Sequence, residues 1–231
     1  MTTAEKPNAV KAFLRLVMIE HSVFALPFAY LAALTAMRLH TACGRERYGW
    51  HGSGWFSYGS DDGYWLLDAT NGGPPVGVGK LPACTDWHWL DWKRLVLLTL
   101  AMVAARTFAM AANRVIDREV DARNPRTANR ELVVGTVSVA TARTGAVVAL
   151  AVFLAVAAAL GPLPLLLAPL AVVPLVVYPY AKRFTDYPHA VLALAQAVAP
   201  IGAWIAVTGH WSWSAVILGV GVGLWIGGFD L

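Results

Sequence analysis

The amino-acid sequence predicts an all-α, multi-pass transmembrane helical bundle, and three observations support this fold class. The 231-residue chain is 58% hydrophobic and only 14% charged, whereas ordinary soluble domains are about 45–50% apolar and about 25% charged. Its apolar residues gather in six long runs, and its basic residues gather between some of them. This composition excludes a disordered chain, and two cysteines are too few for a disulfide framework.

Each of the six runs approaches the length of a membrane span, since a hydrocarbon core of about 30 Å requires roughly 20 apolar residues. In order, they are Leu16–Met37, Leu95–Ala112, Val137–Leu160, Leu165–Tyr180, Ala190–Val207 and Trp213–Gly228. We expect Gly161-Pro162-Leu163-Pro164 to break the chain between the third and fourth helices. The first run is too long for the apolar part of a signal peptide, so we expect no cleaved leader.

The basic residues predict the orientation of the bundle. They lie before the first run, between the second and third, and between the fourth and fifth, and include Lys6, Lys11, Arg15, Arg114, Arg118, Arg123, Lys182 and Arg183. With six spans, all three segments fall on one side of the membrane, which the positive-inside rule assigns to the cytoplasm. We therefore predict a single domain over residues 1–231 with a cytoplasmic N-terminus.

Residues 40–92 contain no apolar run long enough to span, and we predict an extracytoplasmic loop insertion there. A disulfide between Cys43 and Cys84 that closes this loop is one interpretation. A metal site formed by these cysteines and nearby histidines is another, although the spacings match no ligand signature. We prefer a loop whose many Trp and Tyr residues rest at the lipid headgroups.

The densest polar segment follows the second run. Asn113, Asp117 and Asp121 are four residues apart, so a continuous helix would place all three on one face. An amide oxygen and two carboxylates suit Mg²⁺, which prefers oxygen ligands and is commonly shared with substrate phosphates. The alternative is a solvated helix end, at which both carboxylates pair with neighbouring arginines.

Arg126 and Arg130 follow these acids in the segment Arg126-Thr127-Ala128-Asn129-Arg130. Guanidinium groups match phosphate oxygens, so arginines beside a metal-binding acidic segment favour a diphosphate ligand. The positive-inside rule alone would explain the arginines but not the acids between them.

Further polar residues occur where lipid disfavours them. Arg106 lies two helical turns before Asn113, and its partner is either a substrate carboxylate or a structural group such as Glu20 or a helix carbonyl. Tyr178 and Lys182 are four residues apart at the end of the fourth run, where Lys182 is either a phosphate ligand or a topology anchor. Asp230 follows the sixth run, and the predicted topology puts it on the same side of the membrane as Asn113.

These motifs together resemble the UbiA superfamily of intramembrane prenyltransferases. The resemblance rests on Asn113-x-x-x-Asp117-x-x-x-Asp121, on Arg126–Arg130 and on Tyr178-Pro179-x-x-Lys182-Arg183-Phe184. It covers nearly all of the chain outside residues 40–92. The segments Ile19–Tyr30 and Gly227–Leu231 look most like the menaquinone branch, the 4-hydroxybenzoate polyprenyltransferase-like enzymes of the futalosine route.

The resemblance implies nine membrane helices around a central cavity, in a bacterial cytoplasmic membrane. It also implies Mg²⁺-dependent transfer of a polyprenyl group from polyprenyl diphosphate to an aromatic acid of the 1,4-dihydroxy-6-naphthoate type. It assigns catalysis to Asp117, Asp121 and Lys182, and metal binding to Asn113, Asp117, Asp121 and Asp230. The substrate-binding residues that it implies are Arg106, Asn113, Arg126, Arg130, Tyr178, Lys182 and Asp230.

The chain departs from the family pattern after Asp230, where the rest of a second acidic motif and three helices would follow. We therefore expect a C-terminally truncated chain, with six helices of nine. The main alternatives are a 4-hydroxybenzoate polyprenyltransferase of ubiquinone biosynthesis and a catalytically inactive truncated membrane protein, and a transporter ranks last. We expect small-molecule substrates and the bilayer as partners, and no nucleic acid.

Overall fold

The computed structural model of the protein describes residues 13, 16, 26–40, 90–209 and 211–229. Glu20, Asp230 and most of the 40–92 segment, including Cys43 and Cys84, lie outside these residues. Within them, every regular element is a helix. The elements are α2 (Leu26–His40), α4 (Trp92–Ile116), α5 (Arg118–Arg123), α6 (Val139–Leu160), α7 (Pro162–Ala181), α8 (Pro188–Thr208) and α9 (Trp213–Phe229).

The predicted all-α membrane bundle is confirmed. Apart from the short α5, these helices coincide with the six apolar runs, in the same order. Four helices, α4, α6, α7 and α8, are long and apolar enough to cross a membrane, and α9 is a shorter apolar helix. The described part of α2 has 15 residues and extends to His40, three residues past the predicted end of the first run.

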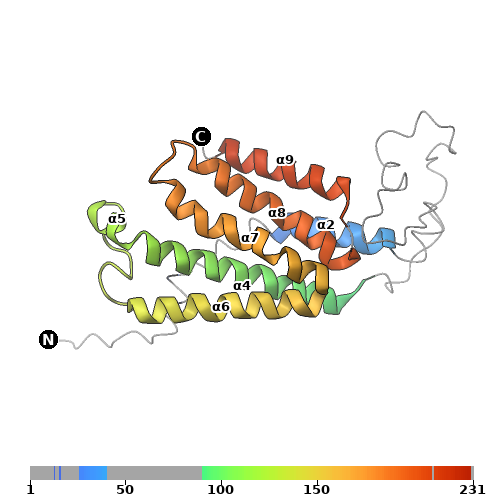
Figure 1. Ribbon diagram of the computed structural model, residues 1–231, viewed down its shortest axis with the longest axis horizontal. Helices are drawn as coiled ribbons and strands as arrows, with labels where there is room; N and C mark the ends of the chain where they lie inside the picture. The colour runs from blue at the N-terminus through green and yellow to red at the C-terminus, as the bar shows by residue number, and fades with distance from the viewer. Residues whose placement is uncertain (1–12, 14–15, 17–25, 41–89, 210, 230–231) are drawn as a thin grey trace.

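The long helices lie side by side along the long axis of the molecule (Figure 1). The α4–α6 and α7–α8 connections lie at one end, together with α5, and the α6–α7 and α8–α9 connections lie at the other (Figure 1). This alternation agrees with the predicted topology. It brings the two described connections that carry Lys and Arg to the same end of the bundle.

Local sequence signals account for the helix boundaries. Asp91 begins α4 by accepting a 3.0 Å hydrogen bond from the backbone N–H of Arg94, and Ser138 caps α6 in the same way through Thr141. The expected break between α6 and α7 is shorter than predicted, because only Gly161 separates the two helices, with a φ of 146°. Pro162 begins α7, since the first helical turn needs no intrahelical N–H donor.

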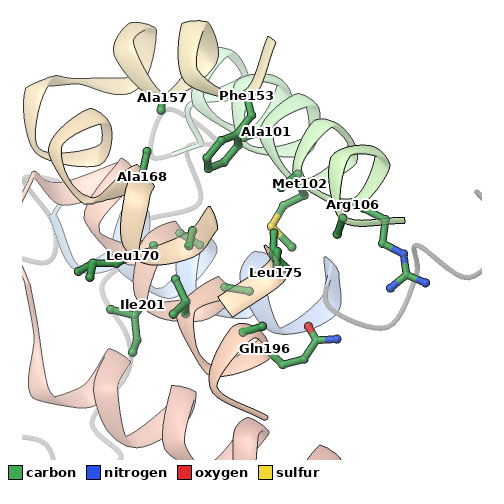
Figure 2. Close-up of a pocket in the computed structure, with 18 of the residues that line it drawn as sticks. Ala101, Met102, Arg106, Phe153, Ala157, Ala168, Leu170, Leu175, Gln196 and Ile201 are labelled. Carbon is green, nitrogen blue, oxygen red and sulfur yellow. The ribbon is translucent and has the colours of Figure 1, made fainter. Parts of the chain in front are cut away.

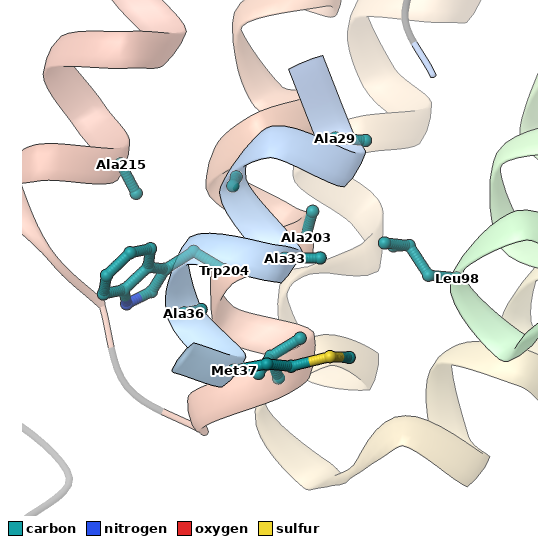
Figure 3. Packing of buried hydrophobic residues seen from close by; sticks show 10 residues of the cluster. Ala29, Ala33, Ala36, Met37, Leu98, Ala203, Trp204 and Ala215 are labelled. Atoms are coloured by element: carbon teal, nitrogen blue, oxygen red, sulfur yellow. The ribbon is translucent and has the colours of Figure 1, made fainter. Parts of the chain in front are cut away.

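Two apolar clusters hold the bundle together. The first joins α2, α4, α8 and α9 through Ala33, Leu98, Trp204 and Ala215 (Figure 3). The second joins α4 and α6, where Phe108 and other small or apolar residues of both helices pack together. Alanine is common in both clusters, as is typical of membrane helices whose backbones approach closely.

Helices α8 and α9 approach each other closely through glycines on α9. A Cβ atom added at Gly219 would lie 2.5 Å from the carbonyl oxygen of Ala197, and one at Gly223 would lie 3.0 Å from that of Ala193. No heavy atom lies within 4 Å of the corresponding position at Gly221. The interface therefore requires glycine at position 219 but not at 221.

We predict that Gly219→Ala destabilises the chain, because the added methyl group would force the α8 and α9 backbones apart. Overpacking of this kind costs on the order of 1–3 kcal/mol. Unfolding by sodium dodecyl sulfate in mixed micelles, followed by circular dichroism, measures the change. The matched control Gly221→Ala should be neutral or slightly stabilising, since alanine favours a helix by about 1 kcal/mol over glycine. Equal stability of the two variants would contradict this packing.

Candidate active site

The α4–α5 junction carries the acidic motif. The expected continuous helix is wrong here, because α4 ends at Ile116 and Asp117 has the non-helical angles φ −86° and ψ 0°. Helical hydrogen bonding nevertheless continues across the break, from Asp117 N–H to the Asn113 carbonyl at 2.9 Å and from Asp121 N–H to the Asp117 carbonyl at 2.8 Å. The four-residue register of the motif is therefore kept while the chain turns.

Both carboxylates are buried and paired with basic groups. Asp117 and Asp121 are each 6% exposed. Lys182 Nζ at the end of α7 lies 3.2 Å from Asp117 Oδ2, and Arg130 Nη1 lies 2.5 and 2.6 Å from the two oxygens of Asp121. The alternative of a solvated helix end is borne out in part, because Asp121 pairs with the neighbouring Arg130, but both carboxylates are buried and not solvated.

Arg183 joins the end of α7 to the end of α4. Its Nη2 atom donates a 2.7 Å hydrogen bond to the Ile116 carbonyl, one of the carbonyls that a helix end leaves without an intrahelical donor. The same atom lies 3.9 Å from Asp117 Oδ1. Sequence reasoning gave Arg183 no role of its own, and the structure makes it a structural neighbour of Asp117.

A tight turn after α5 returns Arg130 to Asp121. Thr127 is buried, and its hydroxyl donates a 3.0 Å hydrogen bond to the Asp121 carbonyl. The Arg130 N–H then donates to the Thr127 carbonyl at 3.1 Å. Arg126 lies exposed on this turn, and in the described part of the chain its guanidinium makes no hydrogen bond or ion pair with the acidic motif.

An apolar cavity of about 400 Å³ lies among α4, α6, α7 and α8 (Figure 2). Its walls are made by residues such as Met102, Phe153 and Leu175, and by many alanines. The polar residues among those that line it are Arg106, Asn113, Tyr178 and Gln196. The cavity therefore suits a largely apolar ligand that carries a few polar groups.

Arg106 and Asn113 line this cavity from the same face of α4, as their spacing predicts. Arg106 Nε and Asn113 Oδ1 are buried and have no hydrogen-bond partner among the described residues. Glu20, the structural partner considered for Arg106, lies outside those residues. Unpaired polar atoms beside a cavity are the groups that a ligand would satisfy.

Tyr178 and Asn113 link the cavity to the acidic motif. Tyr178 lines the cavity, and Lys182 Nζ lies 4.5 Å from the centre of its ring, within cation–π distance. Pro179 therefore does not separate the two side chains. Asn113 lines the cavity and precedes Asp117 by one turn. The ion pairs of the acidic motif thus adjoin the apolar cavity through Asn113 and Tyr178, and we treat the two together as the candidate site.

Sequence reasoning missed Gln196, which lines the cavity from α8, whereas Arg106 lines it from α4 (Figure 2). The signal was present, because Gln196 is the one amide in the apolar run Ala190–Val207. A polar side chain inside a membrane helix is a functional hypothesis by default. Asp230, by contrast, lies outside the described residues, so its place in the site stays a prediction.

Comparisons with known proteins give the relatives of the chain. A family model described as the UbiA prenyltransferase family matches residues 74–231. A 4-hydroxybenzoate octaprenyltransferase of Albidiferax ferrireducens is 34% identical over 156 residues, which cover 67% of this chain and 50% of that protein. The mitochondrial 4-hydroxybenzoate polyprenyltransferase of Schizosaccharomyces pombe is 32% identical over 126 residues, covering 54% and 35%.

Two solved structures are also similar to this chain. The apo structure of a UbiA homolog from Aeropyrum pernix is 30% identical, with a TM-score of 0.64, and the match covers 92% of this chain and 62% of that one. A digeranylgeranylglyceryl phosphate synthase shares the fold, with a TM-score of 0.66 at 13% identity. The chain spans about half the length of the first curated relatives that it matches. The matched residues and the helical fold show that the chain belongs to the UbiA prenyltransferase family.

Proposed function

We propose that this protein takes part in the transfer of a polyprenyl group from polyprenyl diphosphate to 4-hydroxybenzoate. The observation that carries the proposal is that two buried carboxylates, each paired with a partly exposed cation, lie next to an apolar cavity of about 400 Å³. A prenyl diphosphate has the matching composition, since one end is highly charged and the other is hydrocarbon. The named relatives favour 4-hydroxybenzoate over the naphthoate that the sequence motifs favoured.

The donor set of the acidic motif fits a magnesium ion. Asn113 Oδ1 is a buried oxygen without a partner among the described residues, and Asp117 and Asp121 add carboxylates close by in the same register. No cluster of three or more His, Cys, Asp or Glu side chains occurs in the described ranges, so phosphate oxygens and Asp230 are the natural further ligands. When bound, Mg²⁺ would neutralise negative charge on the diphosphate.

Lys182 and Arg130 are the groups that meet the leaving diphosphate in this proposal. Each now pairs with a buried carboxylate, and each has donors that suit phosphate oxygens equally well. As the allylic C–O bond breaks, both bonding electrons leave with the diphosphate. Cationic donors that are already oriented stabilise this developing charge without reorganising water.

In this proposal the second step of the reaction, attack of the aromatic ring on the allylic cation, takes place in the cavity. Its apolar walls hold the prenyl chain and exclude water from the allylic cation, so that the aromatic ring rather than water attacks it. A ring carbon forms the new C–C bond, and the ring then releases its proton. Arg106 holds the carboxylate of the acceptor, since its buried Nε atom has no partner among the described residues.

The polar end of the bundle faces the cytoplasm in this proposal, because the α4–α6 and α7–α8 connections carry the basic residues there. Water-soluble 4-hydroxybenzoate would then reach the site from the cytoplasm, and the prenyl chain would enter from the bilayer. The membrane is the bacterial cytoplasmic membrane.

Membranes that contain the protein test the proposal directly. Geranyl diphosphate and Mg²⁺ are supplied with either 4-hydroxybenzoate or 1,4-dihydroxy-6-naphthoate, and prenylated products are identified by mass spectrometry. We expect prenylated 4-hydroxybenzoate and little naphthoate product. A preference for the naphthoate would overturn the proposed acceptor. Absence of both products would favour the non-catalytic alternative.

We predict that Asp117→Asn and Asp121→Asn each reduce Mg²⁺-dependent transfer at least a hundredfold, because each removes a charge that holds the metal and orients a cationic partner. Initial rates at saturating Mg²⁺ measure the effect. Glu119→Gln is the matched control, since Glu119 is an exposed carboxylate of the same segment. Wild-type rates in both Asp variants, or an equal loss in the control, would contradict the assignment.

We predict that Arg106→Leu raises the KM for the acceptor at least tenfold while the KM for geranyl diphosphate changes less than twofold. The reason is that a guanidinium–carboxylate hydrogen bond contributes about 1.5–3 kcal/mol. Steady-state kinetics with each substrate varied in turn separate the two constants. Equal changes in both would assign Arg106 to the general structure of the cavity instead.

A further inference from the structure

Gln196 is a polar side chain in an otherwise apolar wall. It lines the cavity from α8, and its cavity neighbours on that helix are Leu192, Ala195, Val198 and Ala199. No hydrogen bond, ion pair or ring contact is recorded for it among the described residues. Gln196 is partly exposed, and an amide in an apolar cavity wall without a protein partner is available to a ligand that can hydrogen-bond to it.

The backbone adds a second polar group at the same residue. Pro200 lies inside α8 and is almost completely buried. A proline has no N–H, so the carbonyl four residues earlier loses its α-helical donor. That carbonyl belongs to Gln196. The residue therefore carries an amide that donates and accepts, together with a carbonyl that lacks its α-helical donor.

This combination matches a hydroxyl group, which accepts one hydrogen bond and donates another. Arg106 lines the same cavity from α4, and Figure 2 shows the two side chains on different helices. An aromatic acid held by its carboxylate at Arg106 would present its remaining ring substituent to another part of the wall. Among the polar residues that line the cavity, Gln196 is the one on α8.

We propose that Gln196 binds the ring hydroxyl of the aromatic acceptor and so determines which aromatic acids the cavity accepts. This inference rests on the proposed function, because it assumes that the cavity holds a hydroxylated aromatic acid. It assigns the hydroxyl to α8 and the carboxylate to α4, two helices that pack around the same cavity. Gln196 is thus a specificity-determining residue, separate from the residues of the acidic motif.

Binding of 4-hydroxybenzoate and benzoate to the purified chain in detergent tests the inference without requiring turnover. The two ligands differ only in the hydroxyl. Isothermal titration should give wild-type protein about tenfold tighter binding of 4-hydroxybenzoate, as expected for a pair of neutral hydrogen bonds. Gln196→Met, which keeps the side-chain length but removes the amide, should abolish this difference and leave benzoate binding unchanged.

Two further variants serve as controls. Leu192→Met lies one turn earlier on the same cavity wall and should keep the wild-type preference. Arg106→Leu should weaken both ligands alike, because both carry the carboxylate. Helix content is checked first by circular dichroism, and Gln196→Leu replaces Gln196→Met if that variant loses its helices.

The outcomes separate this inference from the proposed function. If wild-type protein binds both ligands and Gln196→Met keeps the preference for 4-hydroxybenzoate, the role of Gln196 is overturned while the acceptor site stands. Equal weakening of both ligands by Gln196→Met would also overturn it, since the residue would then only shape the cavity. If wild-type protein binds neither ligand, the proposed acceptor site itself fails.

Discussion

Asp117 and Asp121 are carboxylates removed from water, and a buried carboxylate without a charged partner is strongly destabilising. Much of the polar end of the bundle serves to supply those partners. The end of α7 brings Lys182 to Asp117, and the turn after α5 brings Arg130 to Asp121. Arg183 and Thr127 hold these two segments through backbone carbonyls. Both carboxylates are consequently paired within the protein, and a diphosphate ligand would compete for the same cations.

The cavity depends on a different property of the chain, which is the small size of its helix-facing residues. Alanine and glycine allow α8 and α9 to pack at backbone distance, and alanines on α4, α7 and α8 leave the space that the cavity occupies. Prolines inside apolar helices leave the carbonyl four residues earlier without its α-helical donor, as Pro200 does for Gln196. An apolar cavity with a few polar groups results, and Asn113 and Tyr178 on its wall adjoin the acidic motif.

Much of this arrangement could be predicted from the sequence because its signals are local. Apolar run length fixed the long helices, and the four-residue spacing of Asn113, Asp117 and Asp121 placed them in one register. Two errors have a common cause. Gly161 alone separates α6 from α7, and α4 breaks at Asp117. Both positions depend on how a chain turns at a helix end, which periodicity does not describe. Gln196 was visible as a polar residue in an apolar run but belonged to no motif.

The sequence by itself determined the membrane class, the order of the helices and the residue types available for chemistry, because hydropathy and spacing act within one segment. Only the tertiary structure decided which groups meet. Lys182 and Asp117 are separated by 65 residues, and Arg106 and Gln196 lie on different helices around one cavity. Such pairings follow from how whole helices pack against one another. The pairing of the two carboxylates with cations and the shape of the cavity are therefore properties of the folded bundle.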